Sequence, residues 1–264
     1  MIHHILKNRG TRLFIILSGI FITSALIAEV IGVKIFSFED TIGVNRANIC
    51  LFGSPFSFHL TAGVLLWPVV FIMADIINEY YGPKGVKFLS YLAIALIGYS
   101  FIMYNGAIVL KPSEYFSIGN GIDKPDNAFR GIFGQGLWII IGSIIAFLLG
   151  QILDVLVFHR IKKATGEKMI WLRSTGSTLI SQLIDSFVVL FIAFYVGKRI
   201  QTGQGDAWSL HQVLVTGTGN YIYKFIVAVL LTPLIYLIHG WIEKYLGHDT
   251  AAAMKKEAMG KENE

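Results

Sequence analysis

The stretch LLWPVVFIMADIINEYYG, residues 65–82, decides how this chain is to be understood. It begins with ten apolar residues and closes with two carboxylates and an amide, those of Asp75, Glu79 and Asn78. On a helix these three positions are i, i+4 and i+3, so their side chains share one face. Charged side chains are costly in hydrocarbon and usually face a bundle interior or a water-filled cavity. The stretch therefore predicts a membrane-spanning helix whose polar face serves the function.

The composition agrees with a membrane protein of one domain. Of 264 residues 54% are hydrophobic and 15% charged, and the mean hydropathy is +0.62, whereas soluble domains carry about 25% charged residues. The net charge of +5 comes from bases that lie between apolar blocks and form no nucleic-acid motif, so no nucleic-acid partner is expected. The single cysteine, Cys50, excludes an intramolecular disulfide.

Six segments are long and apolar enough to span a bilayer, which takes about 20 residues. They cover residues 13–33, 60–80, 88–110, 132–158, 174–196 and 212–238. The first has 21 residues, longer than the roughly 7–15 of a signal peptide. The predicted fold is an all-α integral membrane bundle of six transmembrane helices, with two inverted three-helix repeats as one arrangement of its halves. The connection at 35–58 is expected to form a small surface hairpin.

The distribution of Lys and Arg predicts the orientation. With the N-terminus inside, the inner segments hold 14 of these residues and the outer segments 7. This predicts a multi-pass protein with both termini in the cytoplasm: residues 1–12 as the N-terminus, 13–243 as a six-helix transporter domain and 244–264 as a polar tail. The tail from 249 onward is rich in Ala, Lys and Glu without an apolar stripe, and we expect it to fray.

Polar residues within the predicted spans are the candidate binding residues. In the fifth span, Ser, Thr and Gln side chains recur on one stripe that leads to Asp185, and in the sixth Asn220 and Lys224 lie i, i+4 apart. Two purely structural alternatives stay open: an ion pair between Asp185 and Lys224, and pairing of Asp154 with the bases that follow it. The candidate substrate-binding residues are Asp75, Asn78, Glu79, Asp154, Gln182, Asp185, Asn220 and Lys224.

The sequence offers no catalytic residue, metal site or cofactor site. It contains no GxSxG, HExxH, CxxC or Walker motif, and its seven histidines show no ligand spacing within a helix. Without an ATP-binding loop the chain cannot drive transport with ATP by itself. Six spans around a polar midplane cavity therefore indicate a small-molecule transporter, and an excess of carboxylates and amides over bases favours a ligand rich in hydrogen-bond donors.

Four segments in this order resemble the queuosine precursor transporters, also grouped as the vitamin uptake transporter family. They are DIINEYYG at 75–82, GQILDVLVF at 150–158, the polar row 174–186 ending in QLIDS, and NYIYK at 220–224. Together they span nearly the whole membrane region, roughly residues 13–238. Two rival functions remain beside this one: a vitamin-binding carrier that works with an external ATPase module, and a membrane-embedded enzyme that uses the Asp75 and Glu79 carboxylates.

The resemblance implies a six-helix inner-membrane protein that imports 7-cyano-7-deazaguanine, 7-aminomethyl-7-deazaguanine or both for tRNA modification. A guanine-like edge presents a ring N–H beside an exocyclic amine, which carboxylates can accept. The amides would match the ring carbonyl and nitrogens, and aromatic residues such as Trp67 and Tyr223 would stack on the ring. The energy source of such a transporter can be proton coupling or facilitated diffusion. Its oligomeric state can be a monomer or a homodimer.

Overall fold

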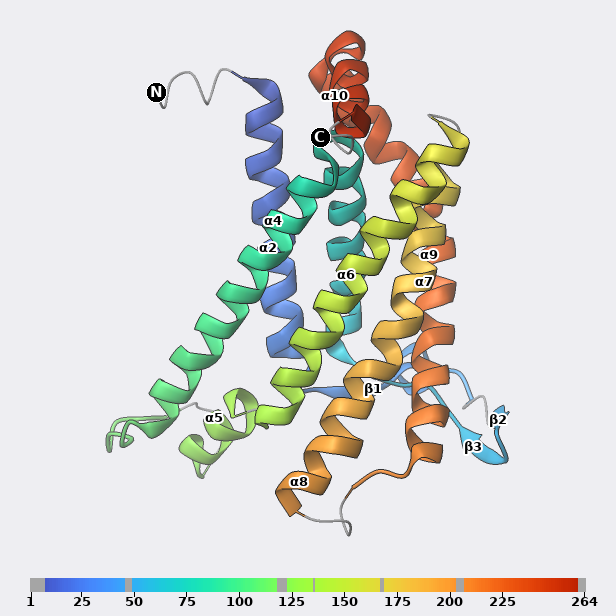
Figure 1. The fold of residues 1–264 in the computed structure, drawn as a ribbon. Helices are drawn as coiled ribbons and strands as arrows, with labels where there is room; N and C mark the ends of the chain where they lie inside the picture. Colours follow the sequence, from blue (N-terminus) through green and yellow to red (C-terminus); the bar gives the residue numbers. More distant parts are fainter. Residues whose placement is uncertain are drawn as a thin grey trace.

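The computed structural model describes residues 8–45, 49–117, 123–134, 136–166, 169–202 and 207–260. Within these residues, five helices are long and apolar enough to cross a membrane. The prediction of an all-α, multi-pass membrane protein is confirmed at this level (Figure 1). The long helices are α2 (Arg9–Ile31), α4 (Trp67–Val109), α6 (Leu137–Thr165), α7 (Ile170–Leu190) and α9 (Leu210–Leu246).

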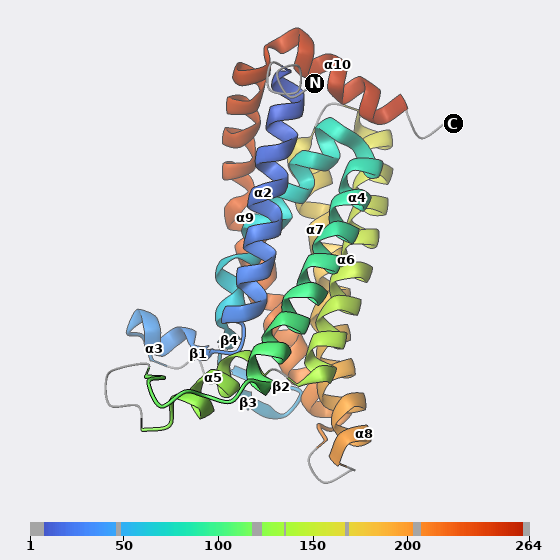
Figure 2. The same ribbon diagram turned by 90° about the vertical axis from the view of Figure 1, so that its left-hand side faces the viewer.

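Shorter helices extend or connect the long ones. A π-helical turn, Phe191–Gly197, continues α7 into α8 (Lys198–Thr202). The helix α5 (Pro125–Phe133) precedes α6, and α10 (His248–Gly260) follows α9. Helix α2 begins at the end of the bundle at which α10 lies, and we call this end the terminal end (Figure 2).

Helix α4 is folded back on itself at Gly82. The backbone there has φ 71° and ψ −177°, a conformation that glycine adopts far more readily than other residues, and Pro83 follows it. The two arms, 67–81 and 83–109, run in opposite directions (Figure 1, cyan and green). The predicted second and third spans thus belong to one helix with a sharp turn, which is why five long helices stand where six spans were predicted.

The core forms where α2 packs against both arms of α4 and where α6 packs along α7. Phe21 and Ala25 of α2 are fully buried, as are Ile76 and Ile77 of α4. Between α6 and α7 the backbones approach so closely that a Cβ at Gly142 would lie 3.1 Å from the carbonyl oxygen of Val189. Small residues at such contacts are typical of membrane helix packing.

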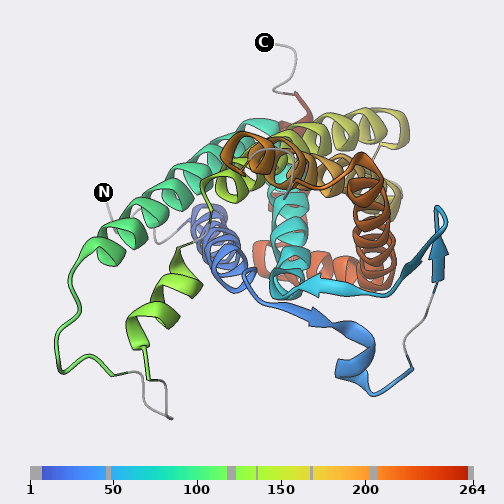
Figure 3. The same cartoon turned by 90° about the horizontal axis from the view of Figure 1, so that it is seen from below.

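Short strands lie at the other end of the bundle, which we call the strand end. β1 (Ile35–Ser37) pairs antiparallel with β4 (His59–Thr61), and β2 (Ile49–Leu51) forms a hairpin with β3 (Ser54–Phe56). The surface hairpin predicted within 35–58 is confirmed, with the short helix α3 (Phe38–Ile42) added before it. Seen from this end (Figure 3), the segment runs along one side of the bundle past α2, α4 and α9.

The prediction that the tail frays is wrong for residues 248–260, which form α10. This helix packs on α4 and α9. Ala251, Lys255 and Ala258 are buried at i, i+4 and i+7, and the Lys255 ammonium is paired with Glu243 of α9. The burying face consists of alanines and a neutralised lysine, so it carries no conspicuous apolar stripe. Residues 261–264 lie outside the described part of the chain.

Candidate functional site

A cavity of about 290 Å³ lies among α2, α4, α6, α7 and α9 toward the strand end. We call it the outer cavity. Strand residues Ile35 and Thr61 close part of its rim. Its other walls combine charged, amide and hydroxyl groups with aromatic rings, a lining suited to a planar polar ligand. The lining includes Glu29, Ser143, Asp185, Asn220 and Lys224, together with Trp67, Phe147, Phe194 and Tyr223.

Asp185 and Lys224 form an ion pair across the outer cavity wall, linking α7 to α9. Their side chains are 21% and 17% exposed, so the pair is neither solvent-exposed nor fully enclosed. The ion pair between these two residues, which the sequence left open as a structural alternative, is therefore present in the structure. Their place in the lining also leaves them within reach of a bound ligand.

A smaller pocket of about 40 Å³ adjoins the outer cavity and shares Trp67, Tyr223 and Lys224 with it. We call it the inner pocket. It contains Asp75, whose side chain is buried. Oδ2 of Asp75 accepts a hydrogen bond from the hydroxyl of Ser174, while Oδ1 has no hydrogen-bond partner among the described residues.

Asp154 lines a third small space between α6 and α7, together with Gln182 and Asp185. The hydroxyl of Ser181 lies 3.5 Å from its Oδ1. The bases that follow it along α6 do not pair with it: within the described residues, Lys162 turns to Glu79 instead. Asp154 therefore faces the same interior as Asp75 and not the membrane interface.

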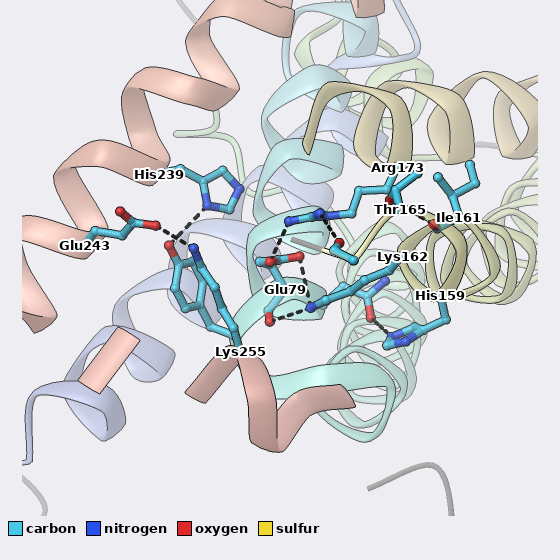
Figure 4. Close-up of polar contacts among 12 residues, drawn as sticks. Glu79, His159, Ile161, Lys162, Thr165, Arg173, His239, Glu243 and Lys255 are labelled. Atoms are coloured by element: carbon cyan, nitrogen blue, oxygen red, sulfur yellow. Dashed lines mark hydrogen bonds and ion pairs between the residues drawn. The ribbon is translucent and has the colours of Figure 1, made fainter. Parts of the chain in front are cut away.

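Glu79 is the centre of a buried ion cluster at the terminal end (Figure 4). Its Oε1 lies 2.7 Å from a guanidinium nitrogen of Arg173, and its Oε2 lies 3.1 Å from Nζ of Lys162. Nζ of Lys162 also donates to the backbone carbonyl of Glu79 at 3.2 Å. All three side chains are 1% exposed. One carboxylate thus ties α4 to α6 and α7, because buried charges persist only when paired.

The neighbours of Glu79 extend this cluster. Oδ1 of Asn78 lies 2.8 Å from Nε2 of His159, and the hydroxyl of Tyr80 lies 3.1 Å from Nδ1 of His239. The ammonium of Lys255 lies 5.4 Å from the centre of the Tyr80 ring. We call Glu79, Lys162 and Arg173 with these neighbours the terminal cluster. Asn78 and Glu79 belong to it and line none of the three spaces described above.

The structure therefore divides the eight predicted site residues into two groups. Asn78 and Glu79 hold the terminal cluster, whereas the other six line the outer cavity, the inner pocket or the space beside Asp154. These six are Asp75, Asp154, Gln182, Asp185, Asn220 and Lys224.

Sequence reasoning missed two features of this interior. Lys162 and Arg173 were counted among the Lys and Arg residues of the inner segments, yet both are buried against Glu79. Both lie beside the end of a predicted span that contains a carboxylate, and this position was the feature of the sequence that could have indicated a buried ion pair. Glu29, in the first predicted span, was not among the predicted site residues. It lines the outer cavity and accepts a hydrogen bond from Ser143.

Comparison with known proteins gives a consistent set of matches. Residues 61–238 match the family described as "Putative vitamin uptake transporter". A protein of Bacillus subtilis (strain 168) named "Probable queuosine precursor transporter" is 30% identical over 69% of this chain and 72% of its own length. The Escherichia coli (strain K12) "Queuosine precursor transporter" is 25% identical over 65% of this chain and 69% of its own length. No solved structure matches the chain.

Proposed function

The chain belongs to the vitamin uptake transporter family, and from that membership we propose that it imports queuosine precursors across the inner membrane. The substrates proposed are 7-cyano-7-deazaguanine, 7-aminomethyl-7-deazaguanine or both. Because the family is one of transporters, the alternative of a membrane-embedded enzyme is wrong. The observation that carries the proposal is the outer cavity, whose aromatic and polar lining continues into a pocket that holds a buried carboxylate.

Three features of the lining support a purine-like ligand. Trp67 borders all three spaces and Tyr223 borders two of them, so a planar bicycle would have aromatic faces beside it wherever it lay. Carboxylate and amide oxygens of Asp75, Gln182 and Asn220 offer acceptors for its N–H groups. Lys224 supplies a donor for a ring carbonyl, although it is already neutralised by Asp185.

Uptake of radiolabelled 7-cyano-7-deazaguanine and 7-aminomethyl-7-deazaguanine tests the proposal. In cells that lack both the biosynthetic pathway and other importers, expression of this chain is expected to raise accumulation of at least one compound well above the empty-vector level. Purified chain in liposomes should do the same. If liposomes take up label only after an ATPase module is added, the chain is a vitamin-type carrier component instead; if neither compound enters under either condition, the proposed substrates are wrong.

We further propose six membrane crossings, with the two arms of α4 counted separately and both termini in the cytoplasm. The excess of Lys and Arg on the terminal-end segments supports this orientation. The proposed topology has three crossings before α5 and three after it, which is the division that inverted repeats require. The outer cavity would then lie toward the outside.

Cysteine labelling in a Cys50→Ser background tests this orientation. Lys163, Lys124 and Lys256 are exposed and suit the purpose. We expect Lys163→Cys and Lys256→Cys to react only with a membrane-permeant maleimide, and Lys124→Cys to react with an impermeant one in intact cells. Labelling of Lys163→Cys from outside would contradict the proposed topology.

A further inference from the structure

The carboxylates in the bundle interior fall into two kinds according to their partners: some face a base, whereas Asp75 and Asp154 face only hydroxyl groups within the described residues. Glu79 is matched by Lys162 and Arg173, and Asp185 is matched by Lys224. Asp75 has only the hydroxyl of Ser174, and no base within ion-pair distance among the described residues. An ionised or polar group in a low-dielectric site requires hydrogen-bond donors. The surroundings of Asp75 are therefore incomplete.

The incomplete part of Asp75 is its Oδ1. This oxygen is buried and without a partner among the described residues, while Oδ2 receives the Ser174 hydroxyl. Two neighbouring hydroxyls are engaged elsewhere: Thr175 bonds Thr232 at 2.9 Å, and Ser177 donates to the backbone carbonyl of Ser174 at 3.1 Å. A molecule that enters the inner pocket can therefore supply the donor that Oδ1 lacks.

Gln182 presents a second acceptor in the same pocket. Its side chain is 3% exposed, lines the inner pocket, and leaves Oε1 without a partner in the described part of the chain. Gln182 lies seven residues after Thr175 and four after Thr178, and both of these also line the pocket, so all three share one face of α7. Two unsatisfied acceptors, on α4 and on α7, thus border one space.

We infer that Asp75 and Gln182 form the subsite that recognises a flat heteroaromatic edge carrying two adjacent N–H donors, a ring N–H beside an exocyclic amine. This assignment rests on the proposed function and narrows it to one edge of the ligand. Ser174 already donates to Oδ2 of Asp75, so Oδ1 is the oxygen without a donor, and Oε1 of Gln182 supplies an acceptor for the second N–H. Trp67 and Phe71, whose rings stack on one another with centroids 6.1 Å apart, also line the pocket and give it an aromatic wall.

The same chemistry predicts what the subsite rejects. Adenine presents a ring nitrogen that accepts hydrogen bonds beside its amine. That nitrogen would face an acceptor oxygen of Asp75 or Gln182, with no proton between the two atoms. An anionic group would meet an uncompensated carboxylate. A ligand that lacks one donor leaves one buried acceptor unpaired, and such mispairing lowers affinity about 5- to 150-fold.

Calorimetric titration of the purified full chain with three ligands tests the assignment. The ligands are 7-cyano-7-deazaguanine, its analogue without the 2-amino group, and its N1-methyl analogue without the ring N–H. Wild-type protein is expected to bind the parent compound at least tenfold more tightly than either analogue. Asp75→Asn and Gln182→Leu should each bind the parent more weakly, and each should lose the preference over one of the two analogues.

Asp126→Asn is the matched control, because it makes the same chemical change at a carboxylate that pairs with Arg130 and lines none of the three spaces. It should keep both preferences. The two substitutions lie on different helices, so if one variant does not fold, the other still tests whether the subsite recognises this edge. Retention of both preferences in the folded variants would overturn the subsite while leaving the proposed function intact. If wild-type protein bound none of the three compounds, the proposed substrate class would fail, and this inference with it.

Discussion

Replacing Glu79 by Gln is expected to destabilise the purified transporter by about 3–5 kcal/mol. The change removes the one carboxylate that neutralises both Lys162 and Arg173, and all three side chains are 1% exposed. Two cations would then remain buried without their counter-ion, which costs far more than the loss of an exposed pair. Thermal unfolding in detergent and the amount of folded protein in the membrane fraction both measure the effect.

Asp126→Asn serves as the control for this prediction. Asp126 pairs with Arg130 at 2.6 Å, and the side chains are 29% and 44% exposed. Exposed pairs contribute about 0–1 kcal/mol, so this variant should unfold close to wild type. A Glu79→Gln protein as stable as wild type, but unable to transport, would show that Glu79 acts on the substrate and not as a tie between helices.

The Asp185–Lys224 pair is expected to behave as a coupled unit. Asp185→Asn or Lys224→Met alone leaves a charge unpaired beside the outer cavity, and each should cost about 1–3 kcal/mol, less than at Glu79 because these side chains are 21% and 17% exposed. The double variant removes both charges and should recover most of the lost stability. Uptake by the double variant is nevertheless expected to fall about tenfold or more, since both side chains line the outer cavity.

The measurement is a double-variant cycle with two readouts, thermal unfolding and uptake of labelled deazaguanine. A matched change in the lining that involves no charge, Asn220→Leu, separates loss of the ion pair from loss of a polar contact. Should both single variants be as stable as wild type, the pair would not be structural, and each residue would have to meet the substrate or a coupling ion separately.

Much of this architecture follows from the sequence. The long apolar blocks predicted membrane helices, and the break between the predicted spans 60–80 and 88–110 coincides with the reversal that α4 makes at Gly82. Because a helix rises about 5.4 Å per turn, i and i+4 positions share a face but not a depth. The i, i+4 spacing placed Asp75 and Glu79 on one face of the helix. Asp75 nevertheless lies in the inner pocket, whereas Glu79, one helical turn away, lies in the terminal cluster.

Depth and partner choice could not be predicted, because both depend on contacts between helices far apart in the chain. Arg173 looked like an ordinary loop charge, since nothing local indicates that a carboxylate 94 residues earlier lies 2.7 Å away. The order of α10 was missed for a related reason. Its buried face is made of alanines and Lys255, and their burial depends on the surface that α4 and α9 provide.

The turn at Gly82 has a consequence for the order in which the molecule is completed during synthesis. A Cβ at this position would lie 3.1 Å from the carbonyl oxygen of Ala258, so the turn is covered by α10, a helix that is synthesised after both arms of α4. Chains fold from the N-terminus as they emerge, and both arms of α4 are therefore made while their connection is still bare. The contact between α10 and this turn can form only after α9 has been synthesised.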